Sequence, residues 1–341
     1  MKKFNLFVVV LLFLLNSKLF SNEWQESFLP NQPDIFKTVI KNNKIYIFPV
    51  ANSYFYSTDF GENWNEVNYP SNAGKLLSAE FYDENNGLIF FINQQLHTVN
   101  LITTSDGGEN WTTLSDSPFN MFSDIKYASE NEIYLFGTEL NLSTGQQTSL
   151  ILYSSDKGSS WNRKNSVEGK YAYCGYVFTD SSIIATDELG NIHKTTDNGE
   201  TWSLKYSQNN SEKRILKLRF FDNIGYVTGG NNTILKTTDE GETWSSIVGD
   251  IESKYTMNII DFLYIDSSKY ILVGKVSRDE NIGAVLYTMN GGENWNEIYS
   301  FESSLTNVNV IKDSILFING GSGIILTTNL NDITDVKEQI Q

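Results

Sequence analysis

Short β-rich runs separated by polar turns make up most of the chain. Runs such as Ile151–Tyr153 and Ile234–Lys236 each lead into a polar turn, which ends in a further short run. Between residues 23 and 330, no stretch of comparable length has the 3.6-residue periodicity of an amphipathic helix. The pattern therefore predicts an all-β protein.

One polar turn recurs as an octet of the form Ser/Thr-x-Asp-x-Gly-x-x-Trp, with Asn in place of Asp in the last copy. Its six copies span residues 57–64, 104–111, 154–161, 195–202, 237–244 and 288–295. Successive octet tryptophans are 47, 50, 41, 42 and 51 residues apart, which is the period of a four-stranded propeller blade. Each octet thus marks a hairpin turn in one blade.

The chemistry of the octet suits a structural turn. Its aspartate can accept hydrogen bonds from backbone N–H groups of the turn, its glycine supplies a positive φ, and its tryptophan packs against a neighbouring layer. We therefore expect structural roles for Asp59, Gly61, Trp64, Asp106, Gly108, Trp111, Asp156, Gly158, Trp161, Asp197, Gly199, Trp202, Asp239, Gly241, Trp244, Asn290, Gly292 and Trp295.

The octet resembles the Asp-box, or BNR, repeat of sialidases, sortilin-type receptors, some xyloglucan hydrolases and the photosystem II assembly/stability factor family. The layout is most similar to the seven-bladed propellers of the last family, whereas sortilin-type and sialidase propellers are more distant. This resemblance implies a propeller of four-stranded antiparallel blades. In that family the propeller is non-catalytic and holds a membrane-protein precursor in an exported compartment.

Two segments outside the six octets predict a seventh blade. Residues 320–329 resemble 229–239, which lead into an octet, but no tryptophan follows them. The missing outer strand is found at the other end of the chain, where Trp24 to Pro30 resemble Trp64 to Pro70. We expect this N-terminal strand, with Trp24 at its start, to close the ring and remove exposed edges. The predicted units are a signal peptide at 1–22, one propeller at 23–329 and a polar tail at 330–341.

The first 22 residues have the pattern of a secretory signal peptide. Lys2 and Lys3 precede an apolar run from Leu6 to Leu15, and Ser21 offers a small residue for cleavage. The run is too short to span a bilayer as a helix, although an uncleaved N-terminal anchor remains an alternative. The chain is thus expected to be exported to the periplasm, the cell surface or the medium, without a membrane span in its mature part.

Composition excludes several classes of function. The chain has 25 basic and 41 acidic residues, and its net charge of −16 argues against nucleic-acid binding. Its single cysteine, Cys174, cannot form an intramolecular disulfide and is expected to be a buried small residue. With only two histidines, His97 and His193, no metal or other cofactor is predicted. We expect a monomer.

Binding residues are expected in the loops opposite the octets, because Asp boxes lie on the rim away from the functional face in propellers of this kind. These loops join the second and third strands of a blade, or one blade to the next. Solvated loop charge is the alternative explanation for their polar residues. The candidates there and on a predicted inner strand are Glu139, Asp187, Glu188, Arg214, Asp261, Arg278, Asp279 and Glu280.

The resemblance admits two kinds of function on that face. A sialidase is disfavoured, since the family uses three arginines for a substrate carboxylate and an Arg-Ile-Pro segment, whereas this chain has four arginines and no such segment. The favoured hypothesis is a non-catalytic scaffold that binds another protein. The alternative is a polysaccharide-binding or glycoside-hydrolase propeller, in which Asp261 faces Glu80 or Asp187 across the channel.

Overall fold

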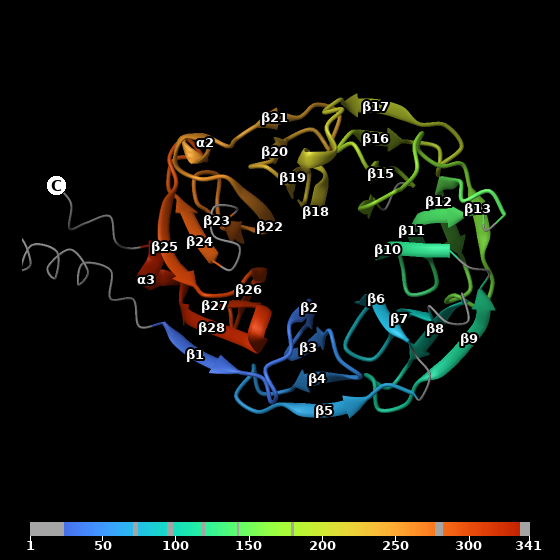
Figure 1. The fold of residues 1–341 in the computed structure, drawn as a ribbon, viewed down its shortest axis with the longest axis horizontal. Helices are drawn as coiled ribbons and strands as arrows, with labels where there is room; N and C mark the ends of the chain where they lie inside the picture. Colours follow the sequence, from blue (N-terminus) through green and yellow to red (C-terminus); the bar gives the residue numbers. More distant parts are fainter. Residues whose placement is uncertain are drawn as a thin grey trace, which may run out of the picture.

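The computed structural model describes residues 24–70, 74–93, 98–117, 120–141, 143–178, 181–276 and 282–334. Seven four-stranded antiparallel sheets are arranged in a ring (Figure 1). The predicted seven-bladed propeller is therefore confirmed.

The blades succeed one another in chain order, and the last blade takes β1 as its outer strand. The first three are β2 (Ile35–Lys41), β3 (Lys44–Pro49), β4 (Ser53–Ser57), β5 (Asn65–Asn68); β6 (Lys75–Phe81), β7 (Gly87–Asn93), β8 (Thr98–Thr104), β9 (Thr112–Ser117); and β10 (Asn120–Tyr127), β11 (Ile133–Leu140), β12 (Gln147–Ser154), β13 (Asn162–Lys164).

The other four blades are β14 (Gly175–Val177), β15 (Ile183–Thr186), β16 (Ile192–Thr195), β17 (Ser203–Tyr206); β18 (Ile215–Phe221), β19 (Ile224–Gly229), β20 (Ile234–Thr237), β21 (Ser245–Ser246); β22 (Met257–Tyr264), β23 (Tyr270–Val276), β24 (Gly283–Thr288), β25 (Asn296–Phe301); and β26 (Leu305–Ile311), β27 (Ile315–Gly320), β28 (Ile324–Asn329), β1 (Gln25–Phe28). Three short helical segments are η1 (Ser211–Lys213), α2 (Ile251–Lys254) and η2 (Gly321–Gly323), and a fourth, α3 (Leu330–Thr334), follows β28.

The hydrophobic core lies between neighbouring blades. In one such layer, Val273 of the sixth blade packs with Leu316 of the seventh. In the next, Ile47 of the first blade packs with Phe317 of the seventh, so the apolar layers continue across the point of closure. Alternating side chains of each sheet thus face the sheets on either side, which is why the strands are apolar on both faces.

The ring is closed by the N-terminal strand, as predicted. β1 pairs antiparallel with β28, placing Gln25 opposite Thr327 and Phe28 opposite Ile324. The Trp24 ring contacts that of Tyr299 on the sixth blade, with the ring centroids 4.8 Å apart. Each described blade therefore has its outer strand, and one of these strands comes from the opposite end of the chain.

The octets form compact turns between the third and fourth strands. In the fifth blade, Thr237 Oγ1 donates to Asp239 Oδ1 at 2.7 Å, and Thr243 N donates to the same oxygen at 2.9 Å. Gly241 adopts φ = +84° and its N–H donates to Thr237 Oγ1. Asn290 replaces the aspartate in the sixth blade and accepts the equivalent bond from Asn294 N. The Asp239 and Asn290 side chains are thus hydrogen-bonded within their own turns.

Strand direction defines two faces of the ring. The box face carries the octets and the hairpins between the first and second strands. The loop face carries the turns between the second and third strands and the connections between blades. At the end of the described chain, α3 buries Ile333 in the core beside the last blade, so the first residues of the predicted polar tail are helical. No helix in the described ranges is long and apolar enough to cross a membrane.

Candidate binding site in the central channel

The first strand of each blade lines the centre of the ring (Figure 1). In six of these strands, pairing with the second strand slips by one residue near the loop face. Such a bulge redirects the extra side chain away from the ladder. The extra residues are Phe36, Leu77, Ser123, Leu216, Ile260 and Thr306, and all six line a cavity of about 560 Å³ that opens on the loop face.

The residue that follows each bulge is polar. These residues are Lys37, Ser78, Asp124, Lys217, Asp261 and Asn307. A second cavity, of about 410 Å³, lies nearer the box face and shares Lys41, Glu80, Lys126, Leu218 and Arg219 with the first. The middle of the channel is therefore lined mainly by charged side chains, whereas the layers between neighbouring blades are apolar.

Asp261, on the inner strand of the sixth blade, is hydrogen-bonded to the fifth and seventh blades. It is fully buried, and its Oδ2 accepts a hydrogen bond from Arg219 of the fifth blade at 2.6 Å and from Val308 N of the seventh at 3.1 Å. Its Oδ1 accepts from Phe262 N at 2.9 Å. Because the carboxylate is fully engaged, its position suits a structural link between blades rather than a free acid or base.

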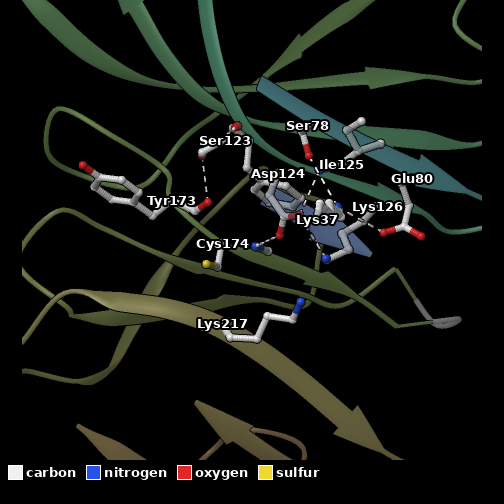
Figure 2. Close-up of polar contacts among 12 residues, drawn as sticks. Lys37, Ser78, Glu80, Ser123, Asp124, Ile125, Lys126, Tyr173, Cys174 and Lys217 are labelled. Carbon is white, nitrogen blue, oxygen red and sulfur yellow. Dashed lines mark hydrogen bonds and ion pairs between the residues drawn. The ribbon is translucent and has the colours of Figure 1, made fainter. Parts of the chain in front are cut away.

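A second charged group spans the first three blades (Figure 2). Lys37 lies 3.4 Å from a Glu80 oxygen, and Lys126 lies 3.0 Å from Asp124. Burial would raise the pKa of Glu80, but Lys37, Lys126 and Lys41 outweigh it and lower that pKa. The general acid of a glycosidase pair needs a raised pKa, so Glu80 does not suit that one of the two carboxylate roles.

Asp124 and Cys174 connect this group to the fourth blade. The Asp124 carboxylate accepts a hydrogen bond from Gly175 N at 3.1 Å. Burial, together with the nearby Asp124 charge, raises the pKa of the Cys174 thiol to about 12. Cys174 is thus the buried small residue expected from the sequence, and it is not poised as a nucleophile.

Lys217 has the least compensated charge among these residues. Within the described part of the chain, the carboxylate that reaches it is Asp261, at 4.0 Å, and that oxygen already binds Arg219. Burial lowers the pKa of Lys217; Asp261 opposes this, and Arg219, Lys37 and Lys126 lower it further. Figure 2 shows Lys217 extending toward the group that contains Lys37 and Lys126.

The mouth of the channel on the loop face combines aromatic and cationic groups. The Arg214 guanidinium lies 4.8 Å from the centre of the Tyr173 ring and donates to its hydroxyl at 3.1 Å. Tyr171 stacks on Tyr173, with their ring centroids 5.2 Å apart. Phe36 stands on the first blade at the same cavity and is 48% exposed.

The structure brings together only part of the predicted set. Arg214 lines the loop-face cavity, and Asp261 lies beneath it. The remaining described candidates are engaged elsewhere, and Glu139 lies in β11 rather than in the expected loop, because β11 and β12 stay paired as far as Leu140 and Gln147. Glu139 pairs with the exposed Arg163 at 2.6 Å, and Glu188 accepts hydrogen bonds from the backbone N–H groups of Lys170 and Tyr171.

Asp187 is buried and organises its own turn. It accepts bonds from the N–H groups of Leu189 and Asn191, and His193 Nε2 lies 3.1 Å from its Oδ2. Arg278, Asp279 and Glu280 lie outside the described residues, as does His97. In the described ranges, no three His, Cys, Asp or Glu side chains are grouped to hold a metal ion.

The channel lysines were missed by reasoning from loops alone. For Lys37 and Lys217 the signal is an apolar residue, any residue and then a polar residue near the start of an inner strand, as in Ile35-Phe36-Lys37 and Ile215-Leu216-Lys217, and six of the inner strands share it. The spacing from this triplet to the octet varies between blades, because the connecting hairpins differ in length. An alignment on the octets therefore does not superimpose the channel residues.

Comparisons with solved structures give propellers of the same architecture. YCF48 bound to D1 peptide matches with a TM-score of 0.67 and 15% identity, over 90% of this chain and 95% of that one. YCF48 from Cyanidioschyzon merolae gives 0.67 and 14%, over 90% and 98%. The GH74 xyloglucanase from Xanthomonas campestris gives 0.66 and 12%, over 91% of this chain and 54% of that chain. At these identities the likeness concerns the fold.

A comparison with curated protein sequences gives no match. The family model Sortilin-Vps10, described as sortilin, neurotensin receptor 3, matches residues 18–188 and 190–320, which is most of the chain. This agrees with the resemblance of the octets to the repeats of sortilin-type receptors. The chain belongs to the Sortilin-Vps10 family.

Proposed function

We propose that this propeller is a non-catalytic scaffold that binds a protein partner through its loop face. The observation that carries the proposal is the distribution of exposed large hydrophobic side chains. Of six in the described residues, four lie at loop-face ends of strands or in loop-face turns: Phe28, Phe36, Val50 and Leu189. Apolar groups gathered on one face of a protein are typical of an interaction surface.

Phe36 and Val50 of this surface belong to the same blade. Their neighbours Ile35 and Pro49 are paired in the first blade, so both exposed side chains stand at the same end of the same hairpin. Val50 is 60% exposed. The bound peptide of the YCF48 structure supports a protein rather than a polysaccharide as the partner. We also propose export as the setting, on the basis of the pattern in residues 1–22.

Site-specific photo-crosslinking in the native host tests the proposal. A photoreactive phenylalanine analogue is placed at Phe36, and its matched control is at Tyr82, which is similarly exposed at 42% but lies in a box-face hairpin. We expect a discrete protein adduct from position 36 and none from position 82. Equal adducts from both positions, or adducts only from position 82, contradict the loop face as the binding surface. Polysaccharide attached at position 36 instead of protein contradicts the proposed class of partner.

A further inference from the structure

The loop-face cavity is cationic in an acidic protein. Its charged lining consists of six cations and two anions: Lys37, Lys41, Lys126, Arg214, Lys217, Arg219, Glu80 and Asp124. The buried Asp261 beneath Arg219 adds one further negative charge, which leaves three positive charges in excess. The chain as a whole has a net charge of −16. A positive potential enclosed by low-dielectric walls attracts anions into such a cavity.

The lysine ammonium groups of the cavity lie below an apolar collar, whereas Arg214 lies at its mouth. Four of the six bulge residues around the cavity are Phe36, Leu77, Leu216 and Ile260. Each precedes the polar residue of its strand by one position and is therefore nearer the loop face, because the inner strands run from that face toward the box face. A ligand entering from the loop face passes apolar side chains before it reaches the ammonium groups.

Of the three lysines Lys37, Lys126 and Lys217, Lys217 has the most distant carboxylate partner. The other two ammonium groups shown in Figure 2 each have a carboxylate within 3.4 Å, Glu80 for Lys37 and Asp124 for Lys126. Lys217 shares a more distant carboxylate with Arg219. A bound anionic group would give Lys217 its own counter-charge and offset the repulsion from Lys37 and Lys126.

We propose that the loop-face cavity is a binding site for a small organic anion with an apolar body. Its carboxylate or phosphate group lies among Lys37, Lys126 and Lys217, and its apolar part contacts the collar. This site goes beyond the proposed protein-binding surface, which surrounds its mouth. Small-molecule sites typically combine such an apolar lining with a few convergent charged groups.

Isothermal titration calorimetry with the purified chain tests the site. The probes are 4-phenylbutyrate and phenyl phosphate as the carboxylate and phosphate arms, with 4-phenylbutanol and 4-phenylbutylamine as neutral and cationic counterparts. We expect at least one of the two anions to bind and neither counterpart to do so. Binding of the alcohol as tightly as the acid, or no binding by either anion at millimolar concentration, overturns the proposal.

Variants connect the affinity to named residues. Lys217→Met should weaken anion binding at least tenfold. Phe36→Ala should weaken binding of whichever of the two anions binds, because it removes part of the apolar collar. Lys75→Met is the matched control, because Lys75 is exposed at the start of β6 and outside the cavity lining. Unchanged affinity in Lys217→Met overturns the assignment.

Chemical labelling of the unmodified chain gives a second readout that does not depend on a variant folding. Acetic anhydride acylates accessible amines, and mass spectrometry reports each lysine separately. The anion that binds should slow acylation of Lys217 and leave Lys75 unchanged. Equal rates at Lys217 with and without that anion overturn the proposal.

Discussion

At the scale of single residues, Asp261 is a fully buried charge that joins several blades. Its buried carboxylate binds Arg219 and two backbone N–H groups, and thereby ties three blades together. Removing one partner of a buried ion pair costs about 3–5 kcal/mol, because the other charge is left uncompensated. We therefore expect Asp261→Ala to lower the free energy of unfolding by about that amount, measured by urea denaturation.

A matched control distinguishes this pair from ordinary surface charge. Glu139 and Arg163 are also 2.6 Å apart, but both side chains are about half exposed. Exposed pairs contribute about 0–1 kcal/mol, so Glu139→Ala should have little effect. The double variant Asp261→Ala/Arg219→Met should recover part of the lost stability. Similar effects of Asp261→Ala and Glu139→Ala would show that the buried link is unimportant.

The lowered pKa of the octet aspartate Asp239 should make the stability of the fold depend on pH in the acid range. Hydrogen bonds from Thr237, Thr243 and the Thr243 backbone lower the pKa of Asp239 to about 2, below the usual value of about 3.9 in an unfolded chain. A pKa that is lower in the folded state gives stability that is present above about pH 4. It is lost as the pH falls toward 2.

Asn290 shows which substitution tests this pH dependence. It occupies the aspartate position of the sixth octet and makes the equivalent backbone bond without a titrating group. Asp239→Asn should therefore flatten the fall in melting temperature between pH 4 and pH 2, relative to the parent chain, in a thermal scan at each pH. Parallel curves for the two proteins would contradict a contribution from Asp239.

At the scale of the element, the bulges explain why glycine stands at the end of the second strand in several blades. A Cβ on Gly229, Gly274 or Gly320 would lie within 2.3 Å of the carbonyl oxygen of Arg214, Asn258 or Ser304, respectively. These oxygens stand beside the bulged part of the neighbouring inner strand. Gly229 and Gly320 belong to the two segments whose similarity predicts the seventh blade, and the structure gives the steric reason for that similarity.

Gly274→Ala tests this reason. The added methyl group would force the Asn258 carbonyl away and shift the bulge that positions Asp261. Overpacking of this kind costs about 1–3 kcal/mol, measured as a lower urea midpoint. Lys275→Ala, on the next residue of the same strand and partly exposed, should change the midpoint little. Equal midpoints for Gly274→Ala and the parent chain would show that the bulge yields without cost.

The octets and the two leftover segments were sufficient to predict the fold, because turn chemistry is local and repeats in each copy. The channel was not predictable in the same way. Lys37, Lys126 and Lys217 are far apart in the sequence, and their proximity depends on the bulges and on closure of the ring. Asp261 was a candidate as a carboxylate on a predicted inner strand. Its partners Arg219 and Val308 were not predictable, because they come from different blades.

At the scale of the whole molecule, closure of the ring by β1 is the feature that joins the two ends of the chain. Gln25 and Thr327 are directly opposite in the β1–β28 pair, and neither side chain is buried. Opposed residues of antiparallel strands have Cα atoms about 4.5–5.5 Å apart, within the range that a disulfide spans. The pair Gln25→Cys/Thr327→Cys should therefore form an intramolecular disulfide, while the native Cys174 is buried.

Such a disulfide closes a loop of about 300 residues, for which the loss of chain entropy in the unfolded state predicts up to about 5 kcal/mol of stabilisation. We expect the oxidised double variant to have a higher thermal midpoint than its reduced form, and the reduced form to match the parent chain. Mass spectrometry and size-exclusion chromatography check that the bond is intramolecular. Intermolecular disulfides, or a failure to oxidise, would mean that β1 does not complete the seventh blade of its own ring. A stabilised monomer would show that closure persists in solution, since only a strand paired in the native register places these two residues together.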